Sequence, residues 1–383
     1  MTTDRRTFLR AAGVAGLGGI AGFTTDREQD DGYHFGVSMK SMGQIGLFVQ
    51  GQAANWYTQD RDDIRVTIAD GEFDAARQTE QTINLLNQGV DAILLNPFDA
   101  RASTRIVEEA KAQDVPVMNF DTATLSEDIL IAVLFGQYRG GEKAAERFLE
   151  LLEERTGGQE ATVITNVFNI GSTTSVKRLE GFTDNLPDSV EVVDQVVSNG
   201  TPEDAAPKMV NSIRANSDVD AIYSNNVGSG LGALQALDQL DMLAPRDSDD
   251  HVMAFGIDGG PNLNQRIQDG LYDFAIDQPL HFYAPISIEL MTNYLDADKS
   301  ADALPSVGDA VVPGEDLTIE NKEVFGITPW GNNFWGPADV TEYEFEDKAW
   351  YPWVRAQSVE ITEENAMAPY LYGTVAREYQ ENQ

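Results

Sequence analysis

The chain has 383 residues, of which 42% are apolar, and its 63 acidic against 26 basic residues give a net charge of −37. This charge argues against a nucleic-acid surface, because binding to phosphates needs a positive patch. The complete lack of Cys excludes disulfides, thiol catalysis and thiolate metal sites. The length allows two buried cores, so we expect two domains.

The first 32 residues are predicted to be an export signal and a linker. Arg5 and Arg6 form a twin-arginine pair ahead of Phe8 and Leu9, and an apolar Ala/Gly run follows over 11–23. Such a run has the length of the hydrophobic region of a signal peptide and is too short to span a bilayer. We expect export by the twin-arginine route to the cell surface or a periplasm-like space.

After the linker, short apolar runs alternate with helical patterns. Helices are predicted over 102–113, Asp74–Asn87 with Asp74 as the N-cap, Gly141–Glu154, and Pro202–Ala215 with Pro at its first position. The predicted strands are Phe35–Met39, Val66–Ala69, Ala92–Leu95, Val117–Phe120, Leu130–Leu134, Ala161–Thr165, Glu191–Val196, Ala221–Tyr223, Val252–Gly256 and Asp273–Ile276. Apolar strands joined by helices are typical of parallel sheets covered on both faces.

The βαβαβ pattern occurs twice, which predicts an α/β fold with two doubly wound parallel-sheet lobes joined by a hinge. The expected division is an N-terminal lobe (33–136), a C-terminal lobe (137–278), a return to the first lobe (279–313) and a C-terminal extension (314–383). We expect the chain to cross between the lobes at Phe135–Gly136, at Gln278–Pro279 and a third time around residue 310.

The extension breaks the βα rhythm and is rich in aromatic residues. It holds four of the five Trp, namely Trp330, Trp335, Trp350 and Trp353. So many aromatic rings would promote aggregation if they were exposed. We expect them to pack on the lobes, with most contacts on one lobe, because a segment crossing both would oppose closure. A docking face for a partner, or a rim to the binding cleft, is the alternative.

No enzyme signature is present. The sequence contains no Gly-x-Ser-x-Gly, no phosphate-binding loop and no His-x-x-x-His pair, and His34, His251 and His281 are far apart. Each His is expected at the surface or in packing rather than as a ligand. We therefore expect no catalytic residues, no metal and no cofactor.

Polar residues instead follow several predicted strands. Ligands of parallel sheets bind beyond the carboxyl ends of the strands, so these residues predict a site for a small polar molecule. They are Ser38, Lys40, Asn96, Asp99, Asp121, Asn225, Asn226, Asp258 and Gln278, together with Arg178 one helical turn after the loop at 171–174.

The same passages resemble a known family. They are 93–97 (ILLNP), 116–121 (PVMNFD), 171–182 (GSTTSVKRLEGF), 221–226 (AIYSNN), 255–261 (FGIDGGP) and 277–279 (DQP). In this order they resemble type I periplasmic sugar-binding proteins, close to the ribose-binding subfamily, over about residues 33–310. The resemblance implies the solute-binding component of an ABC importer, a monomer that closes on a sugar or polyol and delivers it to permease subunits.

The resemblance places ligand contacts on Asp121, Arg178, Asn226, Asp258 and Gln278. Their side chains suit hydroxyl groups, which both donate and accept hydrogen bonds. Ser38 is a further candidate.

The chain departs from the ribose binders in three places. Thr122 stands where they carry Arg, and Lys40 is expected to supply the missing charge. The first loop, residues 39–48, lacks the paired aromatic residues and offers Phe48 alone. The segment before Pro202 has Asn199 and Gly200 in place of an aromatic residue.

These departures leave a non-sugar polar ligand, such as a nucleoside or a signalling molecule, as an alternative. A sugar-responsive transcription factor and an exported enzyme are rival interpretations. The export signal and the acidity speak against the first, and the lack of a nucleophile–base pair speaks against the second. The even spread of acidic residues is typical of proteins that fold in concentrated salt. We therefore expect a halophilic source, with an acidic mesophilic protein as the alternative.

Overall fold

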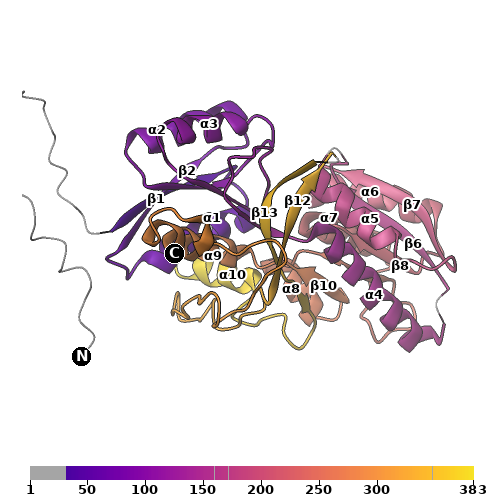
Figure 1. The fold of residues 1–383 in the computed structure, drawn as a ribbon. Helices are drawn as coiled ribbons and strands as arrows, with labels where there is room; N and C mark the ends of the chain where they lie inside the picture. The colour runs from indigo at the N-terminus through magenta and orange to yellow at the C-terminus, as the bar shows by residue number, and fades with distance from the viewer. Residues whose placement is uncertain (1–31, 159, 171, 347) are drawn as a thin grey trace, which may run out of the picture. The chain divides into compact units, whose positions relative to one another are not determined.

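The computed structural model describes residues 32–158, 160–170, 172–346 and 348–383. The predicted export signal therefore lies outside the described residues, as does Gly171. Two α/β lobes follow one another along the chain (Figure 1), as the sequence predicts. No helix within the described residues combines the length and the apolar character needed to cross a membrane.

An eight-stranded sheet forms the N-terminal lobe, in the order β11-β12-β13-β5-β4-β3-β1-β2. The strands from β13 to β2 are parallel, whereas β12 is antiparallel to β13 and β11 to β12. Their bounds are β1 (Tyr33–Met39), β2 (Ile64–Asp70), β3 (Ala92–Asn96), β4 (Val117–Phe120), β5 (Ala132–Phe135), β11 (Ala310–Val311), β12 (Ala338–Phe345) and β13 (Lys348–Ala356).

Helices cover both faces of this sheet (Figure 1). Helices α2 (Ala75–Asn87) and α3 (Thr104–Ala112) lie on one face, and α1 (Ile45–Thr58) and α9 (Tyr283–Asp296) lie on the other. Successive residues of β3 point to opposite faces, so Ile93 packs with α2 and α3 whereas Leu94 packs with α1 and α9. Asp74 caps α2 as predicted, because its carboxylate accepts a bond of 2.8 Å from the Arg77 N–H.

The C-terminal lobe contains a six-stranded sheet in the order β14-β10-β9-β8-β6-β7. Its strands are β6 (Ala161–Phe168), β7 (Val190–Ser198), β8 (Ala221–Ser224), β9 (Met253–Ile257), β10 (Phe274–Asp277) and β14 (Val359–Ile361). One face packs on α4 (Gln137–Thr156) and α5 (Thr173–Thr183), and the other packs on α6 (Pro202–Ala215) and α7 (Val227–Gln239), with α8 (Pro261–Gln268) next to α7.

The chain crosses between the two sheets at three points. The first crossing follows β5 at Gly136, and the second follows β10 at Gln278–Pro279, both as predicted. The second leads through the short helix η2 (Leu280–Phe282) into α9, and the short helix η3 (Ala301–Ala303) follows. The third crossing runs from β13 to β14 at Gln357–Ser358. Its predicted position near residue 310 is wrong, because β11 to β13 extend the first sheet before the chain crosses.

The C-terminal extension belongs to both lobes. Strands β12 and β13 cover the β5 edge of the larger sheet, whereas β14 pairs with β10 in the smaller sheet. The final helix, α10 (Tyr372–Glu381), packs on both α1 and α8. The extension therefore contacts both lobes, and the expectation that most of its contacts fall on one lobe stays a prediction. Each sheet has an edge whose backbone groups need partners, and the extension supplies a strand to both.

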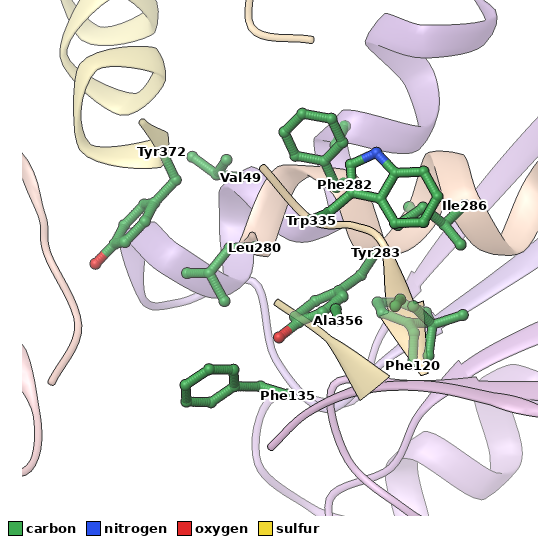
Figure 2. Close-up of a cluster of buried hydrophobic side chains, with 14 of the residues drawn as sticks. Val49, Phe120, Phe135, Leu280, Phe282, Tyr283, Ile286, Trp335, Ala356 and Tyr372 are labelled. Atoms are coloured by element: carbon green, nitrogen blue, oxygen red, sulfur yellow. The ribbon is translucent and has the colours of Figure 1, made fainter. Parts of the chain in front are cut away.

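The expected packing of the extension's aromatic rings is confirmed for Trp330 and Trp335, whose exposed fractions are 1% and 0%. Figure 2 shows Trp335 beside Phe282 and Ile286, with Tyr283 and Ala356 in the same cluster. Two further Trp of the extension, Trp350 and Trp353, are only partly buried.

Candidate functional site

Two carboxylates stand at the carboxyl ends of equivalent strands. Asp121 follows β4 and Asp258 follows β9, and each of these is the fourth strand of its lobe. Both residues adopt left-handed backbone conformations, with φ of 62° and 68°. Asp tolerates this region better than most side chains do. Each backbone N–H donates a bond of 3.0 Å to the neighbouring strand, from Asp121 to Val133 and from Asp258 to Ile276.

The Asp121 cluster consists of Lys40, Gln50, Asp121 and Thr122. The ammonium group of Lys40 donates to Oδ2 of Asp121 at 2.7 Å, and the amide of Gln50 donates to Oδ1 at 2.8 Å. The hydroxyl of Thr122 donates to Oδ2 at 3.0 Å and accepts a bond from Lys40 at 2.9 Å. Lys40 thus places a positive charge directly beside Asp121 and Thr122.

The electrostatics of this cluster keep Asp121 ionised. The side chain of Asp121 is only 11% exposed, and burial by itself opposes ionisation. The charge of Lys40 and the hydrogen bonds from Lys40, Gln50 and Thr122 outweigh burial and hold the pKa of Asp121 below its usual range. The protein thus keeps a negative charge in a nearly buried position.

The Asp258 cluster consists of Gln137, Arg178, Asp258, Gln278 and Tyr283. The guanidinium of Arg178, only 3% exposed, donates to Oδ2 of Asp258 at 2.6 Å. The amide of Gln278 donates to Oδ1 of Asp258 at 2.7 Å, and Tyr283 donates to Gln278 at 2.9 Å. Gln137 accepts a bond of 2.7 Å from Nε of Arg178. Burial lowers the pKa of Arg178, but the charge of Asp258 and the hydrogen bond to it together outweigh burial and raise the pKa.

Tyr283 connects the two clusters electrostatically. Its side chain is fully buried at the start of α9, directly after the second crossing. Burial raises the pKa of the phenol, and the charges of Asp121 and Asp258 raise it further, while Arg178 acts in the opposite direction. Carboxylates of both lobes therefore act on a single hydroxyl group.

Asp277 lies beside the Asp258 cluster. One of its oxygens accepts a bond of 3.0 Å from the Gly259 N–H, and Oδ2 has no partner among the described residues. Burial, followed by the charge of Asp258, raises the pKa of Asp277 to about 8. The Asp277 carboxyl group is therefore protonated at neutral pH.

Six of the predicted site residues make other contacts. Asn96 donates to Gln50 at 2.8 Å, Asp99 accepts from the Ala102 N–H at 2.7 Å, and Asn225 donates to the Ser175 hydroxyl at 2.8 Å. Ser38 is buried and bonds Thr82 at 2.7 Å. Asn226 caps α7, since its side chain accepts from the Ser229 N–H at 3.0 Å and donates to the Gly200 carbonyl at 3.1 Å. Phe48 packs against Tyr379 of α10 at 4.8 Å between ring centroids. The structure brings the other six together, Lys40, Asp121 and Thr122 in one cluster and Arg178, Asp258 and Gln278 in the other.

Sequence reasoning missed Gln50, Gln137 and Tyr283. Gln50 is a polar residue within the apolar stretch of α1 and is only 1% exposed, so its position in that stretch is a usable signal. Gln137 directly follows the first crossing, and Tyr283 lies shortly after the second. No pattern in the sequence marks either residue.

The chemistry of both clusters suits hydroxyl groups. A carboxylate has about four sites for accepting hydrogen bonds. Asp121 uses three of them and Asp258 two within the protein. No grouping of His and carboxylates in the part of the chain that the structure describes could hold a metal ion.

Several known proteins are similar to this chain in sequence or fold. A ribose import binding protein from Bacillus subtilis is 26% identical over 62% of this chain and 73% of its own length. A xylitol-binding protein from Mycolicibacterium smegmatis is 27% identical over 83% of both chains. The fold matches that of an ABC transporter solute binding protein from Bacillus halodurans C-125 with bound myo-inositol, with a TM-score of 0.64, 20% identity, and coverage of 89% of this chain and 99% of that one.

The family model described as "Periplasmic binding protein domain" matches residues 35–299. This range includes both clusters and the first two crossings between the sheets. The chain belongs to the periplasmic binding protein family.

Proposed function

We propose that this protein is the extracytoplasmic solute-binding component of an ABC importer and that it captures a sugar or polyol between its lobes. The family to which it belongs acts outside the cytoplasm. The relatives described above bind ribose and xylitol according to their names, and the solved structure contains myo-inositol. All three compounds carry several hydroxyl groups.

The observation that carries the proposal is the matched pair Asp121 and Asp258. Each carboxylate has one oxygen on a cation and the other on a glutamine amide, and each retains capacity to accept bonds from hydroxyls. Lys40 and Arg178 can donate to ring or hydroxyl oxygens while they remain close to their carboxylates. Charged groups make the stronger hydrogen bonds to such a ligand.

Capture would proceed by a hinge motion at the three crossings. Gln278 and Tyr283 flank the second crossing and link it to Asp258. A ligand that bonds Asp121 and Asp258 at once would bind best when the lobes are closed, and its binding energy would then shift the equilibrium toward that state. The closed protein would deliver the ligand to permease subunits. We propose further that the protein acts as a monomer exported by the twin-arginine route in a halophile, without a catalytic role.

A thermal-shift panel tests this function. The purified protein in molar KCl is heated with D-ribose, D-xylose, xylitol, myo-inositol or adenosine. A ligand at 100 times its Kd stabilises the folded protein by about 2.7 kcal/mol, which raises the melting temperature measurably. We expect a sugar or polyol to give this shift. A shift with adenosine alone would favour the nucleoside alternative, and no shift with any hydroxylated compound would contradict the proposal.

A further inference from the structure

Two exposed phenylalanines lie next to the Asp121 cluster. Phe73 follows β2 and is 40% exposed, and Phe98 follows β3 and is 43% exposed. Their rings meet edge to face, with centroids 6.0 Å apart. This pair presents apolar surface at the carboxyl edge of the N-terminal sheet, where a soluble protein would ordinarily place polar residues.

Phe73 and the residue before it have an uncommon backbone conformation. Glu72 and Phe73 are consecutive left-handed residues, with φ of 50° and 58°. Bulky residues seldom adopt this region. The Phe73 N–H donates to the Lys40 carbonyl at 2.8 Å, and the Glu72 N–H donates to Asp70 at 2.9 Å. These bonds fix the exposed position of the Phe73 ring.

Hydrogen bonds also connect Phe73 to one oxygen of Asp121. Its N–H bonds the carbonyl of Lys40, and the Lys40 ammonium bonds Oδ2.

A longer chain of bonds connects Phe98 to the other oxygen. The Phe98 N–H donates to Gln78, Gln78 to the Asn96 carbonyl, the Asn96 amide to Gln50, and Gln50 to Oδ1 of Asp121. Hydrogen bonds thus lead from the phenylalanine pair to both oxygens of the Asp121 carboxylate.

The order of strands identifies what faces this pair. The first two crossings follow β5 and β10. Counted from these strands, the larger sheet has the order β5-β4-β3-β1-β2 and the smaller has the order β10-β9-β8-β6-β7. The loop after β6 therefore corresponds to the loop after β1, which Phe98 and Phe73 flank on either side. Ile170 lies in the loop after β6 and is 55% exposed. Because closing lobes bring equivalent edges together, Ile170 would meet the gap between the two rings.

We propose that Phe73, Phe98 and Ile170 form an apolar latch that joins the lobes when the protein closes. This inference rests on the proposed function, since it assumes closure. The three side chains lose apolar exposure only in the closed state, so the latch stabilises that state. It acts on every ligand alike, because it touches the opposite lobe and not the ligand. Its main effect is to slow ligand release.

Cross-linking tests the contact directly, and the lack of Cys in the chain provides a clean background. The double variant Phe98→Cys with Ile170→Cys is treated with a short bis-maleimide. The control pairs Phe98→Cys with Val192→Cys. Val192 is another exposed aliphatic residue of the C-terminal lobe, on β7 and six residues before the strand's carboxyl end, or about 20 Å away.

Free protein that samples the closed state should cross-link the 98/170 pair at least about tenfold faster than the 98/192 pair. Equal rates would overturn the latch. D-xylose, xylitol or myo-inositol should accelerate the cross-linking of the 98/170 pair and leave that of the 98/192 pair unchanged. If none of them does, yet the first pair still reacts faster, the latch stands while the proposed function fails.

Alanine variants provide a second test. Phe73→Ala, Phe98→Ala and Ile170→Ala should each speed the release of D-xylose and xylitol by a similar factor of about three to ten, with Val192→Ala unchanged. The melting temperature without added sugar should change little, because about half of each side chain is already exposed in the free protein. A change that differs strongly between the two compounds would assign the rings to ligand recognition and overturn the latch.

Discussion

Asp121 and Asp258 have matching environments in the two lobes. Each follows the fourth strand, has a positive φ, and places one oxygen on a cation, at 2.7 Å and 2.6 Å, and the other on a glutamine amide, at 2.8 Å and 2.7 Å. The cations come from different elements, because Lys40 follows β1 whereas Arg178 lies within α5. The same electrostatic arrangement is therefore built twice from different parts of the two lobes.

The ion pair of the Asp258 cluster predicts a large effect on stability. Asp258→Ala leaves the charge of Arg178 buried and unpaired, which should cost about 3–5 kcal/mol of unfolding free energy in urea denaturation. The adjacent pair Lys177–Glu180 is exposed, so Glu180→Ala should cost less than about 1 kcal/mol. Similar losses in both variants would show that the Arg178 pair is screened by solvent.

Gln50 offers a test of a residue that the sequence did not reveal. Gln50→Ala removes a donor to Asp121 and leaves the Asn96 amide without its acceptor. We expect the affinity for the sugar or polyol found in the panel to fall about tenfold by calorimetry. Gln52→Ala is the control, because the Gln52 side chain accepts a bond from Asn55 within α1 and none from the Asp121 cluster among the described residues. Equal effects of both substitutions would remove Gln50 from the site.

Much of this arrangement was predictable from the sequence. Apolar runs ending in polar residues located the strands and hence Asp121, Asp258 and Gln278, because a strand's period and its end are local properties. Arg178 lies within α5, and the family resemblance singled it out. Ser38 and Asn226 also follow strands, but their side chains turn to Thr82 and to the start of α7. A strand end fixes where a residue lies and does not fix the partner that its side chain selects.

The extension was the least predictable part. Its strands β13 and β14 add to the edges of β5 and β10, so their register depends on strands that are distant in sequence. Buried and more exposed residues alternate along much of β12 and β13, as in a hairpin with one covered face. The many aromatic residues of this segment hid that alternation in the sequence. The contact of Phe48 with Tyr379 was equally hidden, since Tyr379 lies in the last helix.

The buried aromatic residues of the extension predict unequal costs. Trp335→Ala should lower the unfolding free energy by about 3–5 kcal/mol, because it opens a cavity beside Phe282 and Ile286. Trp350→Ala should cost clearly less, because that ring is only partly buried and lies against Lys348 at 3.9 Å. Guanidinium denaturation of both variants measures the difference, and comparable costs would contradict the assigned packing.

Asp277 predicts a specific dependence of stability on pH. Its folded pKa is about 8, whereas an unfolded Asp titrates near 3.9. The stability from this shift is fully present below about pH 4 and is lost as the pH rises to about 8. Asp277→Asn removes the titration, so the wild type should lose stability relative to this variant by up to about 1.4 kcal/mol per pH unit in that window. Parallel urea-denaturation profiles of the two proteins would contradict the raised pKa.

The net charge of −37 predicts a dependence on salt. The folded state concentrates this charge, so screening should raise the melting temperature markedly between dilute buffer and molar KCl. Sucrose at matched osmolality serves as the control, because it adds no screening. A melting temperature that is level in KCl, or that rises equally in sucrose, would remove the halophilic interpretation.

The central claim is that Asp121 and Asp258 bind one ligand together. Isothermal calorimetry with the sugar or polyol that most stabilises the wild type tests it in Asp121→Asn, Asp258→Asn and the exposed control Asp249→Asn. We predict that each of the first two substitutions weakens binding by about 2 kcal/mol or more, roughly 30-fold, and that the control leaves it unchanged. Wild-type affinity in either the Asp121 or the Asp258 variant would contradict capture of the ligand by both lobes.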